Sequence, residues 1–143
     1  MGIWSYSPFG NDYAADFAFE LDDAASVMEV ERLLSAACVG AELPRSVAST
    51  GLAPACVGYA AASLILAARS PHCLGEEDRS YRPARWYPPL VFEHEEELRQ
   101  RARSVELVLR QWATSEVLDS DELRVIREYL HRLGRLRECT ESA

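Results

Sequence analysis

Two successive runs of apolar residues at helical spacing, near the C-terminal end, constrain the fold of this chain more than any other feature. Their apolar side chains recur three or four residues apart, which is the period of an amphipathic α-helix. The first run comprises Leu98, Ala102, Val105, Leu109 and Trp112, and the second comprises Leu123, Ile126, Leu130 and Leu133. Each buried Leu, Ile or Val contributes roughly 1.5–3 kcal/mol. Packing between these two helices is therefore expected to anchor the fold.

Two amphipathic helices are predicted near the N-terminus. Asn11 and Asp12 are residue types that commonly cap helix N-termini, and an apolar face follows them as far as Leu21. Asp22 and Asp23 follow directly and can cap the second helix. The sequence therefore predicts two short helices joined by a tight turn.

A third helix is predicted from Pro54 to Arg69, where the chain is rich in Ala and apolar nearly all round. Such a helix suits the centre of a bundle. Asp119 and Glu122 form a capping-box variant that separates the last two helices. Only Leu90–Phe92 is a candidate strand. Residues 1–143 are therefore expected to form an all-α, single-domain bundle of about five helices.

The segment 71–92 is expected to be a long irregular loop between the third and fourth helices. It contains Gly75, Pro83, Pro88 and Pro89. At roughly twenty residues it exceeds the usual length of a connection, which indicates a functional segment or one packed across the surface. Residues 1–10 are expected to form an N-terminal aromatic segment, and residues 139–143 a frayed tail.

Composition excludes several classes of function. The formal net charge of −8 disfavours general nucleic-acid binding. No apolar run is long enough to cross a bilayer and no secretory signal is seen, so no membrane partner and a cytoplasmic location are expected. All 15 basic residues are Arg, so the chain offers no lysine for a Schiff base or a P-loop.

The cysteines and histidines predict no cofactor. Cys38 and Cys56 lie among Ala and Val and are interpreted as core residues in a reducing compartment, without a disulfide framework. His72, Cys73 and His94 are the only soft-metal set that stands out, but adjacent ligands are poorly spaced for zinc and there is no CxxC. We therefore predict no metal, no cofactor and no catalytic residue.

Two N-terminal groups of residues have a functional and a structural interpretation. A possible polar site comprises Asn11, Asp12 and Asp16. Asp12 and Asp16 share a helix face, so their carboxylates would be close enough to hold a cation or to shift each other's pKa. Capping and favourable interaction with the helix dipole explain the same residues, and we favour that interpretation. Trp4, Tyr6 and Phe9 are expected to dock the N-terminus on the bundle rather than to cage a ligand.

The loop also carries a segment in which Arg alternates with aromatic residues. Arg, Tyr and Trp are enriched at the energetic centres of protein interfaces. The alternative is a loop folded over the bundle, with its aromatic residues buried and its Arg residues paired with Glu76, Glu77, Asp78 or Glu93. The candidate partner-binding residues are Arg79, Tyr81, Arg82, Arg85, Trp86 and Tyr87. Single-stranded nucleic acid is a third alternative for this local patch.

Two segments together resemble an uncharacterised bacterial family, domain of unknown function 4259. The N-terminal motif with Trp4, Phe9–Asp12 and Ala15–Phe17 is similar to the opening of that family, and Ser115–Leu118 resembles its Ser-Glu-Leu segment. The Ala-rich stretch 60–68 also fits the middle of the family. The resemblance implies a small all-helical bacterial protein, and it carries over no catalytic residue.

The function predicted from these observations is that of a non-enzymatic, acidic helical factor that binds another protein. Its role would be accessory, regulatory or of the immunity type, because the chain lacks a catalytic constellation and carries the arginine–aromatic loop. One alternative is a small-molecule binder or enzyme with a cleft near Asp12 and Asp16. The other alternative is a structural homodimer formed through residual apolar helix faces.

Overall fold

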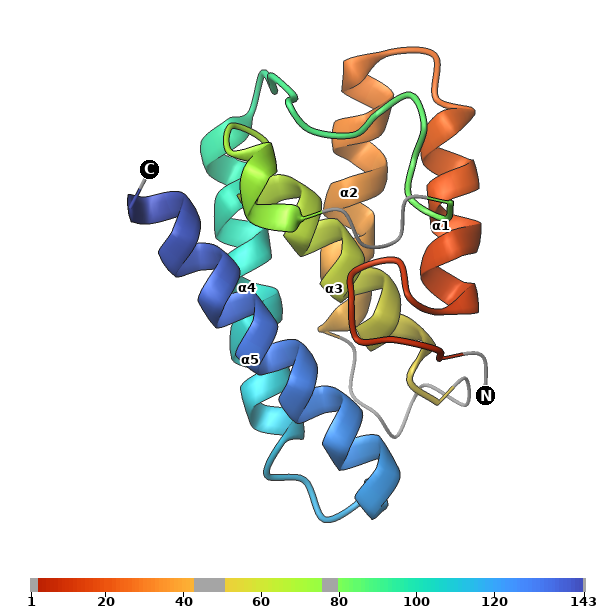
Figure 1. Cartoon of the computed structure of the whole chain (residues 1–143), viewed down its shortest axis with the longest axis vertical. Coiled ribbons are helices and arrows are strands. Elements are labelled where there is room, and N and C mark those ends of the chain that lie inside the picture. The colour runs from red at the N-terminus through yellow and green to blue at the C-terminus, as the bar shows by residue number, and fades with distance from the viewer. Residues whose placement is uncertain (1–2, 43–50, 76–79, 143) are drawn as a thin grey trace.

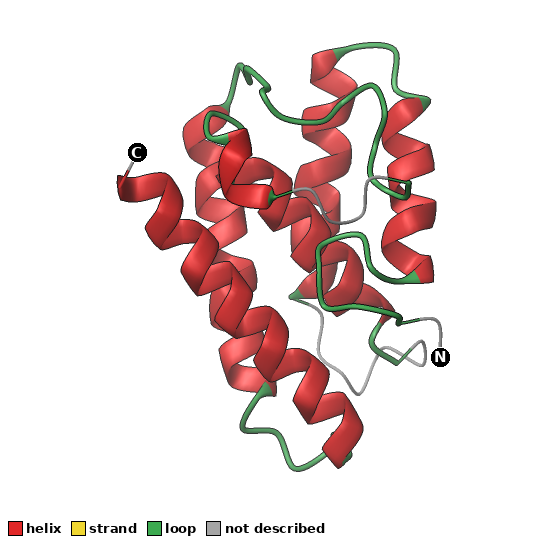
Figure 2. Ribbon diagram, viewed as in Figure 1, coloured by secondary structure: helices red, strands yellow, loops and turns green. Residues whose placement is uncertain are grey.

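The chain folds into a bundle of α-helices, as the sequence predicts. The structure, a computed structural model, describes residues 3–42, 51–75 and 80–142. These residues form five α-helices and one 3-10 helix, and no strand lies among them (Figures 1 and 2). The elements are α1 (Asp12–Asp22), α2 (Val27–Ala41), α3 (Ala53–Leu66), η2 (Pro71–Leu74), α4 (Glu95–Trp112) and α5 (Ser120–Ser142). The all-α prediction is confirmed, and the candidate strand Leu90–Phe92 lies in a loop.

Helix α3 lies in the middle of the molecule and packs against α1, α2, α4 and α5 (Figure 1). Eleven of its 14 residues are buried, which confirms the prediction of a central apolar helix. Gly58 permits its close approach to α2, because a Cβ at this position would collide with the Cβ of Ala41. Small side chains at this crossing therefore set how closely the two helices pack.

Helix α4 packs against α2, α3 and α5, and helix α5 packs against α3 and α4. The predicted stripe of α4 is buried over its whole length. On α5 the buried face is turned slightly from the prediction, so that Tyr129 is fully buried and Leu130 only partly. Asp119 and Glu122 form the expected capping box, in which Asp119 Oδ1 accepts from the Glu122 amide at 2.8 Å and Glu122 Oε1 accepts from the Asp119 amide at 3.1 Å.

The helix caps near the N-terminus agree with the sequence only in part. Asn11 caps α1, since its side-chain oxygen accepts from the Ala14 amide at 2.8 Å. Ser26 caps α2 by accepting from the Glu29 amide at 3.3 Å. The prediction that Asp22 and its neighbour cap the second helix is wrong, because Asp22 is the last residue of α1.

A disulfide joins Cys73 of η2 to Cys139 of α5. The expectation of a chain without disulfides is therefore wrong for this pair, whereas Cys38 and Cys56 are buried free thiols. Helix α5 continues to Ser142, so residues 139–142 of the expected frayed tail are helical, and residue 143 lies outside the described residues. The first four residues of the predicted irregular loop form η2. Among the described helices, none combines the length and apolarity that crossing a membrane requires.

Candidate functional site

The arginine–aromatic loop lies across the turn between α1 and α2 (Figure 1). The Asp22 carboxylate accepts two backbone hydrogen bonds from the loop, from the Ala84 amide at 3.1 Å and from the Arg85 amide at 2.9 Å. A carboxylate that accepts two amide groups forms charge-assisted bonds and fixes the local backbone. Asp22 therefore positions the loop, which is a role that the sequence did not reveal.

Further hydrogen bonds hold the same loop on the bundle. Trp86 donates its indole N–H to the Ala24 carbonyl at 3.1 Å, and Arg85 donates to the same oxygen at 3.3 Å. Further along, the Leu90 amide donates to the Ala68 carbonyl at 2.8 Å. The loop is thus fixed against the α1–α2 turn and against the end of α3.

Both described arginines of the predicted partner-binding set stack on aromatic rings. The guanidinium carbon of Arg82 lies 4.2 Å from the ring centre of Tyr87, and that of Arg85 lies 5.1 Å from the ring centre of Trp86. Within the described part of the chain neither arginine forms an ion pair, and Arg79 lies outside it. Cation–π contact restrains both guanidinium groups without using their N–H donors, one of which, on Arg85, is bonded to the Ala24 carbonyl.

The N-terminal aromatic segment meets this loop through Trp4. The Trp4 and Tyr81 rings lie 4.9 Å apart between their centres and are tilted by 50°. About half of each residue is exposed, 48% for Trp4 and 50% for Tyr81, although aromatic residues of this size are usually more buried. Phe9, by contrast, is fully buried and docks the segment on the bundle as predicted. We call Trp4, Tyr81, Arg82 and Arg85 the arginine–aromatic surface.

A hollow lies beside Trp4, which is part of its lining. It has a volume of about 310 Å³ and is lined by the N-terminal segment and by the first turns of α5, including Ile3, Tyr6, Arg124 and Val125. Its lining combines apolar and aromatic side chains with Ser5, Asp121 and Arg124. The hollow thus extends the arginine–aromatic surface with a concave, partly apolar area.

The three residues of the predicted polar site separate into two environments. Asp12 and Asp16 are exposed on the first turns of α1, and Asn11 is fully buried. Besides capping α1, Asn11 donates its side-chain amide to the Tyr129 hydroxyl at 3.3 Å. The structure therefore places Asn11 in the core and leaves the two carboxylates in solvent.

Tyr129 belongs to a buried polar cluster that the sequence did not indicate. Its ring stacks on Tyr59 with 4.1 Å between the ring centres, and its hydroxyl lies 3.5 Å from the Cys56 sulfur. The Tyr59 hydroxyl donates to the Tyr6 carbonyl at 2.7 Å. Burial raises the pKa of Cys56 to about 11 and also raises the pKa of Tyr129. These groups are uncharged near neutral pH, and the cluster joins the N-terminal segment to α3 and α5.

A groove between α2 and α4, of about 500 Å³, contains the buried carboxylate of Glu31. Glu31 accepts from the backbone amides of His94 at 2.8 Å and Glu93 at 3.2 Å, and it lies 3.5 Å from the His94 ring nitrogen. These three residues could hold a metal ion by proximity. However, both Glu31 oxygens already accept backbone N–H groups at the start of α4, so the arrangement is a tertiary helix cap.

Comparison with known proteins gives a family and no activity. A family model described as "Domain of unknown function (DUF4259)" matches residues 2–124. No curated protein and no solved structure matches the chain. The matched range includes the N-terminal motif and the arginine–aromatic loop, and it ends within the first two turns of α5.

Proposed function

The chain belongs to the DUF4259 family, whose description names no activity, and we propose from its geometry that it is a non-enzymatic accessory, regulatory or immunity-type factor that binds another protein. The observation that supports the proposal best is the half-exposed Trp4–Tyr81 pair on a loop that hydrogen bonds fix in place. Large aromatic rings held outside the core are a feature of binding surfaces.

The loop is already ordered in the way that favours protein binding. Its backbone is held by Asp22, and its two described arginines stack on Tyr87 and Trp86. Association is weakened by the entropy of ordering side chains and loops at an interface, so a surface that is fixed beforehand binds more tightly. Arg and Trp are also the residue types that most often dominate binding energy.

The same surface indicates the chemistry of the partner. Among the described residues no carboxylate forms an ion pair with Arg82 or Arg85, so the partner should present carboxylates to them. The hollow beside Trp4 would receive an apolar side chain of the partner. The remaining surface is acidic, with a net charge of −8 over the chain, and would attract basic groups at the rim of the interface.

The compartment that we propose is the bacterial cytoplasm. There, cellular thiol reductants keep most cysteines reduced. Cys73 and Cys139 would accordingly spend much of their time as thiols, although they form a disulfide in the structure.

Photo-crosslinking in cells tests the proposal. A photoreactive phenylalanine analogue replaces Tyr81, which is half-exposed, and a control carries it at Leu107, which is 55% exposed on α4. The proposal expects a discrete protein adduct from position 81 and none from position 107. It is overturned if position 81 gives no adduct, or the same adducts as position 107.

The crosslinked partner is then purified and its affinity measured with the full chain. The double variant Arg82→Ala with Arg85→Ala should bind at least about tenfold more weakly, which corresponds to loss of one interface hot spot. Arg103→Ala is the matched control, because Arg103 is an exposed arginine on α4. Equal affinity of the double variant and the control would refute the assignment of the surface.

A further inference from the structure

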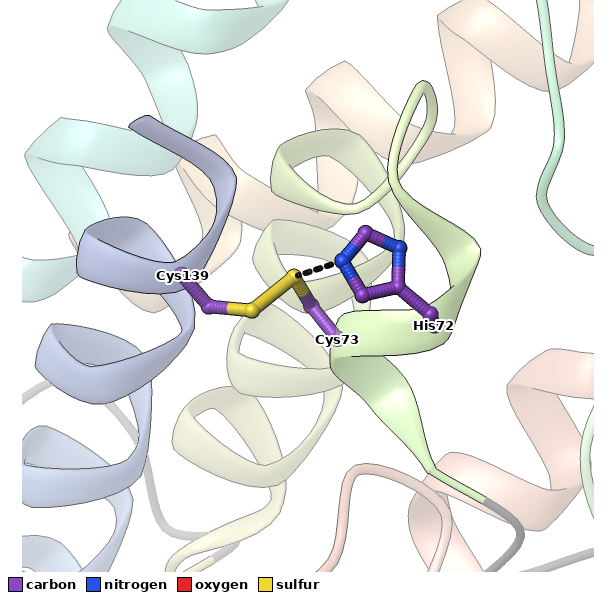
Figure 3. A group of neighbouring side chains, drawn as sticks. All are labelled: His72, Cys73 and Cys139. Carbon is purple, nitrogen blue, oxygen red and sulfur yellow. Dashed lines mark hydrogen bonds between the residues drawn. A yellow bond between two sulfur atoms is a disulfide. The ribbon is translucent and has the colours of Figure 1, made fainter. Parts of the chain in front are cut away.

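Three soft-metal ligands come together at the contact between η2 and α5. They are the side chains of His72, Cys73 and Cys139 (Figure 3). The His72 Nε2 atom lies 3.6 Å from the Cys73 sulfur, and the three candidate ligand atoms all lie within 4.8 Å of one another. Cys139 is 66 residues from Cys73 in sequence, which explains why spacing alone did not place it in the set.

We propose that these residues form a redox-controlled zinc site, which binds Zn²⁺ when Cys73 and Cys139 are reduced and cannot bind it when they form the disulfide. Two thiolates and one imidazole are ligands that Zn²⁺ prefers, and three protein ligands leave a fourth position open. This site is separate from the arginine–aromatic surface, so it does not depend on the proposed protein binding.

The observed spacing suits tetrahedral zinc. With Zn–S near 2.3 Å and Zn–N near 2.0–2.1 Å, a tetrahedral ion holds sulfur and nitrogen about 3.5 Å apart and two sulfurs about 3.8 Å apart. The 3.6 Å between His72 Nε2 and the Cys73 sulfur already meets the first requirement. The Cα atoms of Cys73 and Cys139 lie 6.1 Å apart, so rotation of the reduced side chains can meet the second.

Adjacent residues made a poor ligand pair in the sequence, and η2 explains why they converge in the structure. The Cys73 amide donates to the Ser70 carbonyl at 3.0 Å, which closes the turn that carries both side chains. In Figure 3 the His72 ring points toward the Cys73 sulfur. His72 is exposed and both cysteines are half-buried, so a metal ion can reach the site.

A cavity of about 420 Å³ adjoins the two cysteines. Its lining includes Tyr59, Ser63, Glu128 and His131. This cavity gives the fourth zinc position room for a water molecule or a small ligand. The site would therefore resemble zinc centres with an open position rather than closed structural ones.

Reduction of the disulfide converts the site into its zinc-binding form. A dithiol reductant transfers two electrons and two protons to the Cys73–Cys139 disulfide, giving two thiols while the reductant becomes a disulfide. Zn²⁺ then displaces one proton from each thiol and binds neutral His72. A disulfide oxidant reverses the sequence by thiol–disulfide exchange: it accepts the two electrons and becomes a dithiol, the Cys73–Cys139 bond forms, and Zn²⁺ is released because its thiolates are consumed.

The other two cysteines do not compete for the metal. Cys38 and Cys56 are fully buried, and burial raises their pKa to about 12 and about 11. A zinc ligand must lose its proton, which these sites disfavour. They therefore serve as internal controls for a thiol-dependent metal site.

Cobalt spectroscopy on the full chain tests the proposal, because Co²⁺ bound by thiolates in a tetrahedral site absorbs strongly in the visible. The reduced chain, freed of reductant under anaerobic conditions, is titrated with Co²⁺ and then with Zn²⁺. We expect one tetrahedral Co²⁺ per chain, displaced by Zn²⁺, which binds such sites more tightly. The oxidised chain should show no such spectrum.

Variants separate the site from general effects on the fold. His72→Ala leaves the disulfide intact and should weaken Co²⁺ binding by at least about tenfold, since loss of even an outer-shell group costs that much. His131→Ala, in the same cavity, and Cys38→Ser should leave binding unchanged. The proposal is overturned if reduced protein gives no tetrahedral spectrum, if it loses its helical circular dichroism, or if His72→Ala binds Co²⁺ as tightly as the unsubstituted chain.

Discussion

The close contact between helices α2 and α3 at Gly58 gives a sharp test of how this bundle is packed. At Gly58 a Cβ atom would collide with the Cβ of Ala41 and would lie 3.4 Å from the Ala37 carbonyl oxygen. Ala41 has no flexible side chain that could move aside, so Gly58→Ala must displace one helix. Gly134, within α5, offers the matched control because a Cβ there meets nothing within 4 Å.

Two opposing effects decide the magnitude. Replacing Gly by Ala within a helix stabilises the folded state by roughly 0.5–1 kcal/mol through backbone entropy. Adding a methyl group to a well-packed core costs about 1–3 kcal/mol. Gly58→Ala should therefore lower the free energy of unfolding by about 1–2 kcal/mol, whereas Gly134→Ala should raise it by about 0.5–1 kcal/mol.

Urea unfolding followed by circular dichroism measures both effects. The two variants make the same chemical change within helices, so the difference in their unfolding midpoints isolates the contact with Ala41. An unfolding free energy for Gly58→Ala equal to or above that of Gly134→Ala would refute the description of a close α2–α3 crossing.

Two further predictions concern buried polar groups. Glu31→Gln should lower the free energy of unfolding by about 1–2 kcal/mol, because one of the acceptors for the His94 and Glu93 amides is lost. The control is Glu97→Gln, at an exposed position of α4, which should change the free energy of unfolding by less than about 0.5 kcal/mol in the same urea titration. Since burial raises the pKa of Cys38 and Cys56 above 9.0, their contribution to stability is complete below that pH and declines as the pH rises beyond it. A thiol reagent at pH 8 should therefore modify neither in the native disulfide form and both in urea; rapid labelling of the native protein would contradict the burial.

The parts of the fold that the sequence predicted are those set by local patterns. The Ala-rich run became the central helix, and Asp119 with Glu122 formed the capping box at the start of α5. These features depend on residues within one or two helical turns of each other, and their side chains have few alternative partners. The all-α class follows from the same local signals.

The parts that the sequence missed depend on contacts between distant residues. Asp is a residue type that commonly caps helices, but the Asp22 carboxylate instead accepts hydrogen bonds from the amides of a loop more than sixty residues away. Glu31 has the pattern of a surface residue and instead caps α4. Cys139 meets Cys73 only because η2 packs on the end of α5. No pattern in the neighbouring residues reports such pairings.

The candidate site likewise combines features that the local sequence indicated with contacts between distant residues that it did not. The alternation of Arg and aromatic residues marked the loop as a candidate surface, but its contact with Trp4 joins it to the distant N-terminal segment. Likewise, Asn11 was expected to serve as a cap, and its hydrogen bond to Tyr129 became visible only in three dimensions. Within the N-terminal motif, Phe9 and Asn11 are therefore buried in the fold, whereas about half of Trp4 stays exposed.

The unfolding free energy of Asn11→Ala, compared with that of Asp12→Ala, tests most directly whether the N-terminal motif has a structural role. Asn11 caps α1 and bonds to the buried Tyr129 hydroxyl, whereas Asp12 is exposed one residue later. Losing the cap and leaving a buried hydroxyl short of a donor should cost about 2–3 kcal/mol for Asn11→Ala, against less than about 0.5 kcal/mol for Asp12→Ala. Equal values for the two variants would contradict a structural role for the N-terminal motif.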